Sequence, residues 1–412
     1  MMKQFLTILS AVLLLWSCNN PVESESSKVA YSMSKSPKRG VAFNFSNSED
    51  LPLLTPYISW DYNWGPDQTD ISAQWMDGEN VDFCPMAWGR NFNADRIRNY
   101  VKVHPKCRYL LAFNEPNLND QARMTPQQAA ELWQPVVDLA RELKLKLVSP
   151  AMNYGTLSGY HDPVKWLDEF FTLVDSNDIY AISVHCYMAS PQALKNYVSL
   201  FEKYGKPIWL TEFCAWEDYA VHSVEDQMSY MSEALNFLEQ SASVERYAWF
   251  IPRAKAGYPY MQLLTSAQPY ELTPLGQMYC GFSSFDKTTW LTSQNVVRAT
   301  DYIALSDDDI QVRPSTCDSG LMLSTFMSGQ FADYQVYVET DAEMLILRYA
   351  ALAVAEIYFY VDGSPLEIVT LPATGSMSEW ASLPFTTSVP HGKHTFRIEV
   401  SKGVINLSWF KL

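Results

Sequence analysis

Two glutamates stand at the ends of apolar runs that lie far apart in the chain. Glu115 closes RYLLAFNE (108–115), directly after Asn114, and Glu212 lies near the end of PIWLTEF (207–213). One carboxylic acid can protonate the leaving oxygen of a glycosidic bond while a second carboxylate attacks the anomeric carbon or activates water. The acid of such a pair needs a pKa raised by burial or by neighbouring negative charge. The pair therefore predicts glycosidic-bond chemistry, provided that the fold brings the two carboxylates together.

Aromatic and polar residues close several other apolar runs in the same part of the chain. Aromatic rings stack on flat apolar faces such as those of sugars, and amide or imidazole groups can hold hydroxyls. Each residue has an ordinary explanation by itself, as a turn former, a paired carboxylate or a core histidine. Their shared position at run ends favours a substrate site, and the candidates are Trp88, Asn114, Asn153, Tyr154, His185, Tyr187 and Trp249.

Eight short apolar runs with helical patterns between them organise residues 38–283. They are GVAFNF (40–45), TPYISW (55–60), VDFCPMAW (81–88), RYLLAFNE (108–115), LKLVSPAM (145–152), YAISVHCY (180–187), PIWLTEF (207–213) and ERYAWFIP (245–252). Strand–helix alternation repeated eight times predicts an α/β fold, a (β/α)8 TIM barrel, whose strand carboxyl ends face the active site. A doubly wound open sheet is the main alternative, but no glycine-rich phosphate loop supports it.

The clearest helical pattern spans residues 125–144. Thr125 is placed as an N-cap and Pro126 as the first helical residue, and apolar residues then recur on one face. Pro135 predicts a kink or local break. A second helix is expected over residues 222–240. Both patterns suit the outer layer of a barrel.

A change of pattern after residue 283 predicts a second domain. Short alternating strands and turns fill residues 296–412, which indicates an all-β sandwich, and residues 284–295 are expected to form a linker.

The N-terminus has the composition of an export signal. A positive start, an apolar stretch and Cys18 after a small residue predict a lipoprotein signal peptide over residues 1–18, with an ordinary secretory signal or a short membrane anchor as the alternatives. Residues 19–37 are expected to be a flexible tether. Lipidation at Cys18 would anchor the chain to a membrane, and we expect an outer-membrane lipoprotein of the bacterial cell envelope. The other six cysteines are expected to be mostly buried thiols, although a Cys186–Cys214 pair is conceivable.

The formal net charge of −16 argues against nucleic acid as a partner. The six histidines show no metal-binding spacing, so we expect neither a metal nor another cofactor. A monomer is expected.

Several of these motifs together resemble a known family. Glutamates at strands four and seven, the first preceded by Asn, are similar to the clan A glycoside hydrolases. The segments YISWDYNWG, FCPMAWG, LLAFNEPN, LVSPAMNYG, ISVHCY and WLTEFCAW resemble glycoside hydrolase family 128, a group of β-1,3-glucanases. The resemblance implies a retaining enzyme with Glu115 as acid/base and Glu212 as nucleophile. It also implies sugar contacts from the residues Asn114, His185, Tyr187, Trp88, Tyr154 and Trp249.

Residues 371–412 resemble carbohydrate-binding module family 6, a galactose-binding-like jelly roll. The resemblance implies a sugar contact from Asn406. Two departures from the family weaken it, because Met377 replaces an aromatic stacking residue and Arg298 replaces a Ca²⁺ ligand. The domain is therefore expected to be either a binding module or a degenerate copy that only packs on the barrel.

Three functions remain open from the sequence. The first is hydrolysis of β-1,3-glucan, with a β-glucan polysaccharide or oligosaccharide as the partner. The second is a non-catalytic surface protein that binds glycans. The third is a clan A hydrolase of another β-glycan.

Overall fold

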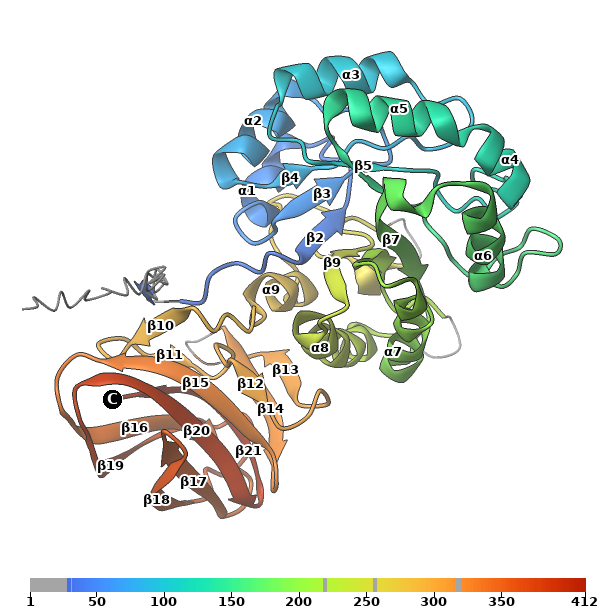
Figure 1. Cartoon of the computed structure of the whole chain (residues 1–412). Helices are drawn as coiled ribbons and strands as arrows, with labels where there is room; N and C mark the ends of the chain where they lie inside the picture. The colour runs from blue at the N-terminus through green and yellow to red at the C-terminus, as the bar shows by residue number, and fades with distance from the viewer. Residues whose placement is uncertain (1–27, 31, 218–220, 255–257, 316, 318–319) are drawn as a thin grey trace, which may run out of the picture.

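The structure is a computed structural model that describes residues 28–30, 32–217, 221–254, 258–315, 317 and 320–412. An N-terminal α/β part and a C-terminal β-sandwich lie next to each other (Figure 1). The predicted signal peptide, Cys18 and most of the predicted tether lie outside the described residues. None of the helices in the described part of the chain combines the length and apolar character that crossing a membrane requires.

The N-terminal part is built on an eight-stranded parallel sheet in the order β4-β3-β2-β9-β8-β7-β6-β5. The strands are β2 (Arg39–Ala42), β3 (Trp60–Tyr62), β4 (Asp82–Phe83), β5 (Tyr109–Leu111), β6 (Lys146–Val148), β7 (Ile179–Cys186), β8 (Ile208–Phe213) and β9 (Val244–Trp249). Each predicted run overlaps one strand. The first and last strands, β2 and β9, are neighbours, so the order never reverses as a doubly wound sheet requires. The sheet curls like that of a TIM barrel.

The two ends of this sheet approach each other beyond β4 and β5. A parallel bridge joins Met86 to Leu111, and the Leu111 N–H donates to the carbonyl of Pro85 at 3.0 Å. The Ala87 N–H donates to the Leu111 carbonyl at 2.8 Å. The backbone groups at both sheet edges are thereby partly satisfied.

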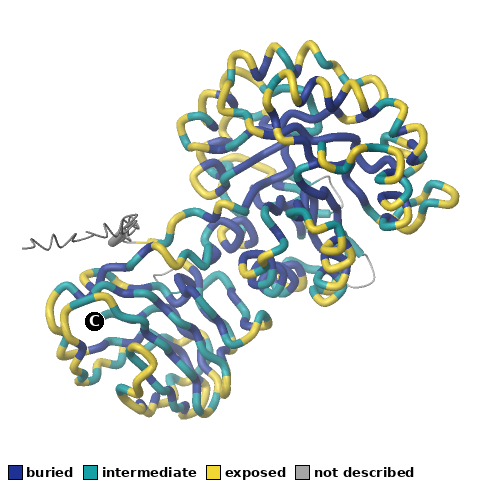
Figure 2. The backbone as a smooth tube through the Cα atoms, viewed as in Figure 1, coloured by how far each residue is buried: buried dark blue, intermediate teal, exposed yellow. Residues whose placement is uncertain are grey.

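Helices cover the outer face of the sheet and leave the strands buried (Figures 1 and 2). The α-helices are α1 (Leu51–Leu54), α2 (Asp70–Glu79), α3 (Ala94–Val103), α4 (Pro126–Glu131), α5 (Trp133–Leu143), α6 (Pro163–Leu173), α7 (Pro191–Ser199), α8 (Val224–Gln240) and α9 (Pro274–Gly281). Short 3-10 turns are η1 (Ser48–Asp50), η2 (Ser176–Asp178), η3 (Glu202–Tyr204) and η4 (Pro259–Met261). The predicted helix over 222–240 is confirmed as α8.

The predicted helix over 125–144 forms, but it is divided into α4 and α5. Thr125 caps it as expected, through a capping box with Gln128. The division falls at Leu132, three residues before the proline that predicted it. Pro135 has no N–H to donate to the carbonyl four residues earlier, so the first turn of α5 can start a new direction there.

The C-terminal part is a sandwich of two sheets, as expected. The first has the order β1-β10-β15-β20-β17-β18 with β12 beside β15, and the second has the order β13-β14-β21-β16-β19 with β11 beside β21. The strands are β1 (Lys28–Ala30), β10 (Thr289–Thr292), β11 (Val297–Arg298), β12 (Ala304–Leu305), β13 (Gln311–Pro314), β14 (Leu321–Met327), β15 (Phe331–Val338), β16 (Ala342–Ala350), β17 (Ala355–Val361), β18 (Ser364–Leu371), β19 (Ala381–Val389), β20 (Gly392–Lys402) and β21 (Val404–Lys411).

Both segments expected to be irregular contain strands. β1 lies in the predicted tether and pairs in parallel with β10, which lies in the predicted linker. Further along the tether, Ser36 is fully buried and its hydroxyl donates to Glu239 at 2.7 Å. Composition suggested flexibility, but edge pairing with the sandwich and a buried acceptor on the barrel order these polar segments.

Helix α8 joins the two parts through buried hydrogen bonds. The Asn236 amide nitrogen donates to the carbonyls of Asp308 at 2.9 Å and Ile310 at 3.0 Å, and its oxygen accepts from the Tyr302 hydroxyl at 2.8 Å. One turn earlier, the Ser232 hydroxyl accepts from the Val312 N–H at 2.6 Å. Such paired polar contacts fix the sandwich to the N-terminal α/β part rather than leaving it on a free linker.

The cysteines within the described residues are all free, and most are buried. Cys186 and Cys214 do not form the disulfide that their strand positions made conceivable. Burial raises the pKa of both thiols. The expectation of buried thiols is confirmed for Cys84, Cys186, Cys214 and Cys280.

Candidate active site

Glu115 lies just beyond β5, at the turn that its sequence predicted. Asn114 still forms a bridge with Ala151, and Glu115 then adopts a left-handed backbone with φ of 43°. The Glu115 carbonyl accepts from the Leu118 N–H at 3.0 Å, which closes the turn. This sharp change of direction presents the carboxylate at the end of the strand while the side chain stays 6% exposed.

Glu212 projects from within β8 and is 4% exposed. In the register of the parallel pair β7–β8 it lies opposite His185. Parallel strands bring their carboxyl ends to one rim. His185 on β7 and Glu212 on β8 therefore meet Glu115, which follows β5.

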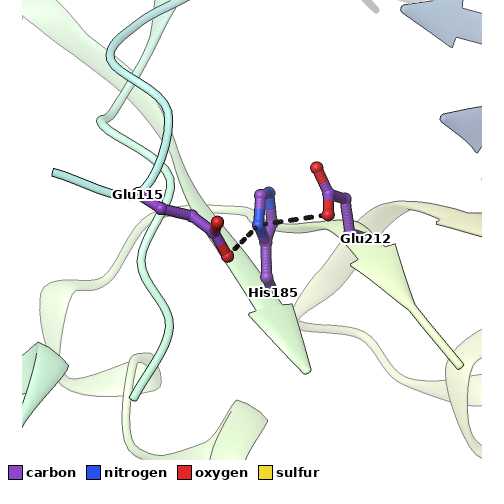
Figure 3. A group of neighbouring side chains, drawn as sticks. All are labelled: Glu115, His185 and Glu212. Atoms are coloured by element: carbon purple, nitrogen blue, oxygen red, sulfur yellow. Dashed lines mark hydrogen bonds and ion pairs between the residues drawn. The ribbon is translucent and has the colours of Figure 1, made fainter. Parts of the chain in front are cut away.

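The three side chains form one compact cluster (Figure 3). His185 Nδ1 lies 2.9 Å from Glu115 Oε1 and 3.5 Å from Glu212 Oε2. One oxygen of each carboxylate and one ring nitrogen all lie within 4.8 Å of one another. The imidazole therefore stands between the two carboxylates that the sequence placed on one rim.

The electrostatics of this cluster differ from the expectation for an acid. Burial opposes a charge on His185, but the negative charges of Glu212 and Glu115 outweigh it and raise the pKa of the imidazole. Burial acts to raise the pKa of Glu115, yet the His185 charge and the hydrogen bonds from His185 and Asn153 outweigh that effect and lower it. Both pKa shifts favour a proton on His185 over one on Glu115, one hydrogen bond away.

Glu212 accepts hydrogen bonds from three aromatic side chains as well. Tyr62 Oη and Trp64 Nε1 each lie 2.8 Å from Oε1, and the Tyr187 hydroxyl donates to Oε2. Burial and then the charge of Glu212 raise the pKa of both tyrosines well above the usual range, so they remain donors. Tyr187 was predicted from the sequence as a site residue, whereas Tyr62 and Trp64 were not. The alternating aromatics of WDYNWG could have indicated them, since residues two apart share one face of a strand.

The amide of Asn153 serves Glu115 in a similar way. Its Nδ2 donates to Glu115 Oε1 at 3.1 Å. Asn117 is fully buried and holds the Asn153 carbonyl through a hydrogen bond of 2.6 Å. Asn114 is 3% exposed, donates to Gln121 at 3.3 Å, and has no hydrogen-bond partner for its buried Oδ1. The amide of Asn114 therefore keeps one unpaired, buried acceptor next to Glu115 in the chain.

Exposed and half-buried aromatic residues lie near the cluster. Trp88 and Tyr154 are 36% and 50% exposed, and the Tyr154 ring packs on Tyr197. Behind Glu212, the rings of Trp216 and Phe250 stack at 5.7 Å, and both pack edge-on against Tyr187. Planar apolar surfaces beside a carboxylate pair suit the faces of pyranose rings.

Trp249 does not belong to this site, contrary to the sequence prediction. It is fully buried, its indole N–H donates to the Met261 carbonyl at 2.8 Å, and its ring packs on Phe213 and Tyr279. Its neighbour Ala248 belongs to the small core cluster formed by Trp60, Tyr62 and other strand residues, whereas Trp249 belongs to the main core. Alternation along β9 therefore turns Trp249 toward the helices.

Asn406 is held by hydrogen bonds within the sandwich. It is 5% exposed, its amide nitrogen donates to the Met377 carbonyl at 2.7 Å, and its oxygen accepts from the Thr325 N–H at 2.9 Å. Arg298, which departs from the Ca²⁺-binding pattern, forms an ion pair with buried Asp301. The guanidinium of Arg298 therefore neutralises this buried carboxylate.

The trio of Glu115, His185 and Glu212 has the donor types that a divalent metal can use. Metal binding requires a neutral imidazole, however, and the raised pKa of His185 favours its protonated form. A proton therefore competes with a metal for the His185 nitrogen.

Paired carboxylates at the carboxyl rim of a curled eight-stranded parallel sheet define the class of this protein as a glycoside hydrolase. The chain belongs to the glycosyl hydrolase catalytic core family, whose model matches residues 40–279. More narrowly, it belongs to glycoside hydrolase family 128. A family 128 (subgroup II) endo-β-1,3-glucanase from Pseudomonas viridiflava is 40% identical, with a TM-score of 0.55, and the match covers 60% of this chain and 98% of that chain.

Two further proteins are similar to parts of this chain. A subgroup II endo-β-1,3-glucanase from Sorangium cellulosum is 34% identical with a TM-score of 0.54, over 59% of this chain and 97% of that one. Alkali-sensitive linkage protein 1 of Schizosaccharomyces pombe is 29% identical over 208 residues, which is 48% of this chain. The match spans only 36% of the length of that curated protein.

The sandwich matches a different module family from the one expected. Residues 307–412 match the model of carbohydrate-binding module family 35, so the assignment to family 6 is wrong. Both families are β-sandwich modules, and the features that suggested family 6 lie in a shared fold. Sequence motifs at the last strand could not separate them.

Proposed function

We propose that this protein is a retaining hydrolase of β-1,3-glucan in which Glu115 is the acid/base and Glu212 the nucleophile. The observation that carries the proposal is the separation of their oxygens, within 4.8 Å. Retaining enzymes hold their carboxyl groups about 5 to 5.5 Å apart, whereas inverting enzymes leave about 6.5 to 9.5 Å for a water molecule. The family 128 relatives, named as endo-β-1,3-glucanases, support the substrate class.

His185 supplies the proton that the first step needs. In the free protein the imidazolium donates to Glu115 at 2.9 Å, so the proton can move to Glu115 when a leaving oxygen comes within reach. Formation of the sugar ester removes the charge of Glu212, which is one of the two that hold the proton on His185. Glu115, then a carboxylate, accepts a proton from the attacking water.

The surrounding residues hold the substrate. Asn114 offers its unpartnered oxygen to a sugar hydroxyl, and Trp88 and Tyr154 offer exposed rings for stacking. Closure of the curled sheet into a full barrel, supported by the Met86–Leu111 bridge, fixes the spacing of the two strands that carry the carboxylates.

The test compares wild type with Glu115→Gln and Glu212→Gln on laminarin. Hydrolysis in wild type and its loss with retained binding in both variants are expected, and nuclear magnetic resonance of the first product should show the β-anomer. The α-anomer first would contradict retention. Binding without any release of sugar by the wild type would instead support the glycan-binding alternative. Release from xylan or mannan in preference to laminarin would support another β-glycan.

A second test addresses the N-terminus. The apolar stretch that ends in a small residue and Cys18 supports anchoring through Cys18 at the cell envelope. Expressed in a bacterium, the full chain should incorporate labelled fatty acid and the Cys18→Ala variant should not. Equal labelling of the two would refute the anchor.

A further inference from the structure

The two oxygens of Glu212 have different surroundings. Oε1 accepts from Tyr62 Oη and Trp64 Nε1, both at 2.8 Å. Oε2 faces the other side, where it meets the Tyr187 hydroxyl and lies 3.5 Å from His185 Nδ1. Of the two oxygens, only Oε2 therefore faces His185, the residue that contacts Glu115 (Figure 3).

The two donors to Oε1 are held by the fold. Tyr62 is fully buried in β3 and stacks parallel to Trp60, with ring centroids 6.0 Å apart. Trp64 adopts a left-handed backbone with φ of 60°, and the next residue, Gly65, accepts from the Met86 N–H at 2.9 Å. A bulky residue keeps that backbone only where its surroundings enforce it. The indole N–H thus approaches Glu212 from a fixed turn.

We infer that Tyr62 and Trp64 are positioning residues that hold Glu212 Oε1 throughout the reaction, so that Oε2 is the attacking atom and Glu212 leaves the sugar readily. The inference rests on the proposed role of Glu212 as nucleophile. Tyr62 and Trp64 then take part in the second step of hydrolysis, in which Glu212 must leave the anomeric carbon.

The chemistry of each step shows why the pair acts mainly on the second. In the first step an Oε2 electron pair bonds to the anomeric carbon, the bond to the leaving oxygen breaks, and that oxygen takes the proton from Glu115. In the second step water loses a proton to Glu115 and bonds to the same carbon, while the Oε2 bond breaks and its electrons return to Glu212. Hydrogen bonds to a carboxylate are stronger than those to a neutral ester, so donors at Oε1 favour release.

The test uses Trp64→Phe, Tyr62→Phe and the double variant, which keep the rings and remove the donors. With an aryl β-laminaribioside that has a good leaving group, removal of either donor should slow breakdown of the glycosyl-enzyme by about 10-fold or more. The values of kcat and KM should fall together while kcat/KM does not fall. Intact-protein mass should show the covalent enzyme at steady state. Trp75→Phe, at an exposed Trp on α2, is the matched control and should change none of these.

Two outcomes separate the failures. A 2-deoxy-2-fluoro laminaribioside should label Glu212 of the wild type, and labelling elsewhere would overturn the proposed function together with this inference. Labelling at Glu212, combined with donor variants whose kcat/KM falls as much as kcat and which accumulate no covalent enzyme, would overturn the inference alone. Thermal unfolding near the wild-type temperature confirms that each variant is folded.

Discussion

Replacement of Asn236 by alanine tests whether the sandwich is a structural part of the hydrolase. The side chain is fully buried in α8 and forms hydrogen bonds with Asp308, Ile310 and Tyr302 of the sandwich. A buried hydrogen bond contributes about 1 kcal/mol net, and a buried group left without its partner costs about 1 to 3 kcal/mol. The variant loses all three bonds and leaves two carbonyls and one hydroxyl unpaired, so we expect a loss of about 3 to 4 kcal/mol.

The assay is differential scanning calorimetry with urea unfolding at a fixed temperature. The wild type should unfold in one transition, because the interface joins the two cores, and Asn236→Ala should separate the sandwich transition from that of the barrel. Asn99→Ala is the matched control, since Asn99 is an exposed residue of helix α3 and its replacement should change stability by less than about 1 kcal/mol. Two separate wild-type transitions that Asn236→Ala leaves in place would refute the reasoning.

Three other predictions concern the active site and the thiols. His185→Asn should raise the pKa of Glu115, because burial remains while the positive charge is lost, and an infrared titration of the carboxyl groups measures it. The folded-state pKa of His185 is raised above its ordinary value of about 6.5. The His185 ion pairs therefore stabilise the wild type fully below about pH 6.5, and this stabilisation declines as the pH rises through the folded-state pKa. The variant should lack this decline in stability. Tyr154→Ala should raise KM for laminarin several-fold with little change in kcat, because the exposed ring can only bind substrate; an equal fall in kcat would contradict this. Cys186 and Cys214 should react with a thiol reagent only after unfolding, and labelling of the native protein at either residue would disprove their burial.

The effect of a chelator on activity distinguishes proton transfer from metal binding in the cluster. A chelator should leave the wild-type activity unchanged, because a protonated imidazole is a poor ligand. Loss of activity with a chelator, restored by a divalent cation, would show that the trio holds a metal.

Local sequence pattern was enough to predict the strands and helices of the N-terminal α/β part. Apolar runs, caps and prolines depend on neighbouring residues, so the eight strands, the Thr125 cap and the strand-end position of Glu115 could be inferred without contacts. Because parallel strands meet at one rim, the pairing of Glu115 with Glu212 also followed from their places in the order of strands. Pro135 predicted a kink or local break in this helix, and the structure has the break at Leu132.

The direction of side chains within buried strands could not be predicted in the same way. Strands covered on both faces are apolar on both, so the sequence does not show which residues turn inward. Trp249 was assigned to the site for this reason, although it faces the helices. The partners of Asn406 could not be predicted either, since its polar groups form hydrogen bonds with residues distant in sequence.

What the sequence determined by itself is the class of chemistry and the elements that carry it, because residue type and local periodicity are properties of short segments. Only the tertiary structure decided how the chemistry is arranged. It placed His185 between the two carboxylates, which lowers the pKa of Glu115 instead of raising it. It also brought Tyr62 and Trp64 to Glu212 across about 150 positions of the chain. Hydrogen bonds and charge interactions act over a few ångströms in space, and no pattern of neighbouring residues records that distance.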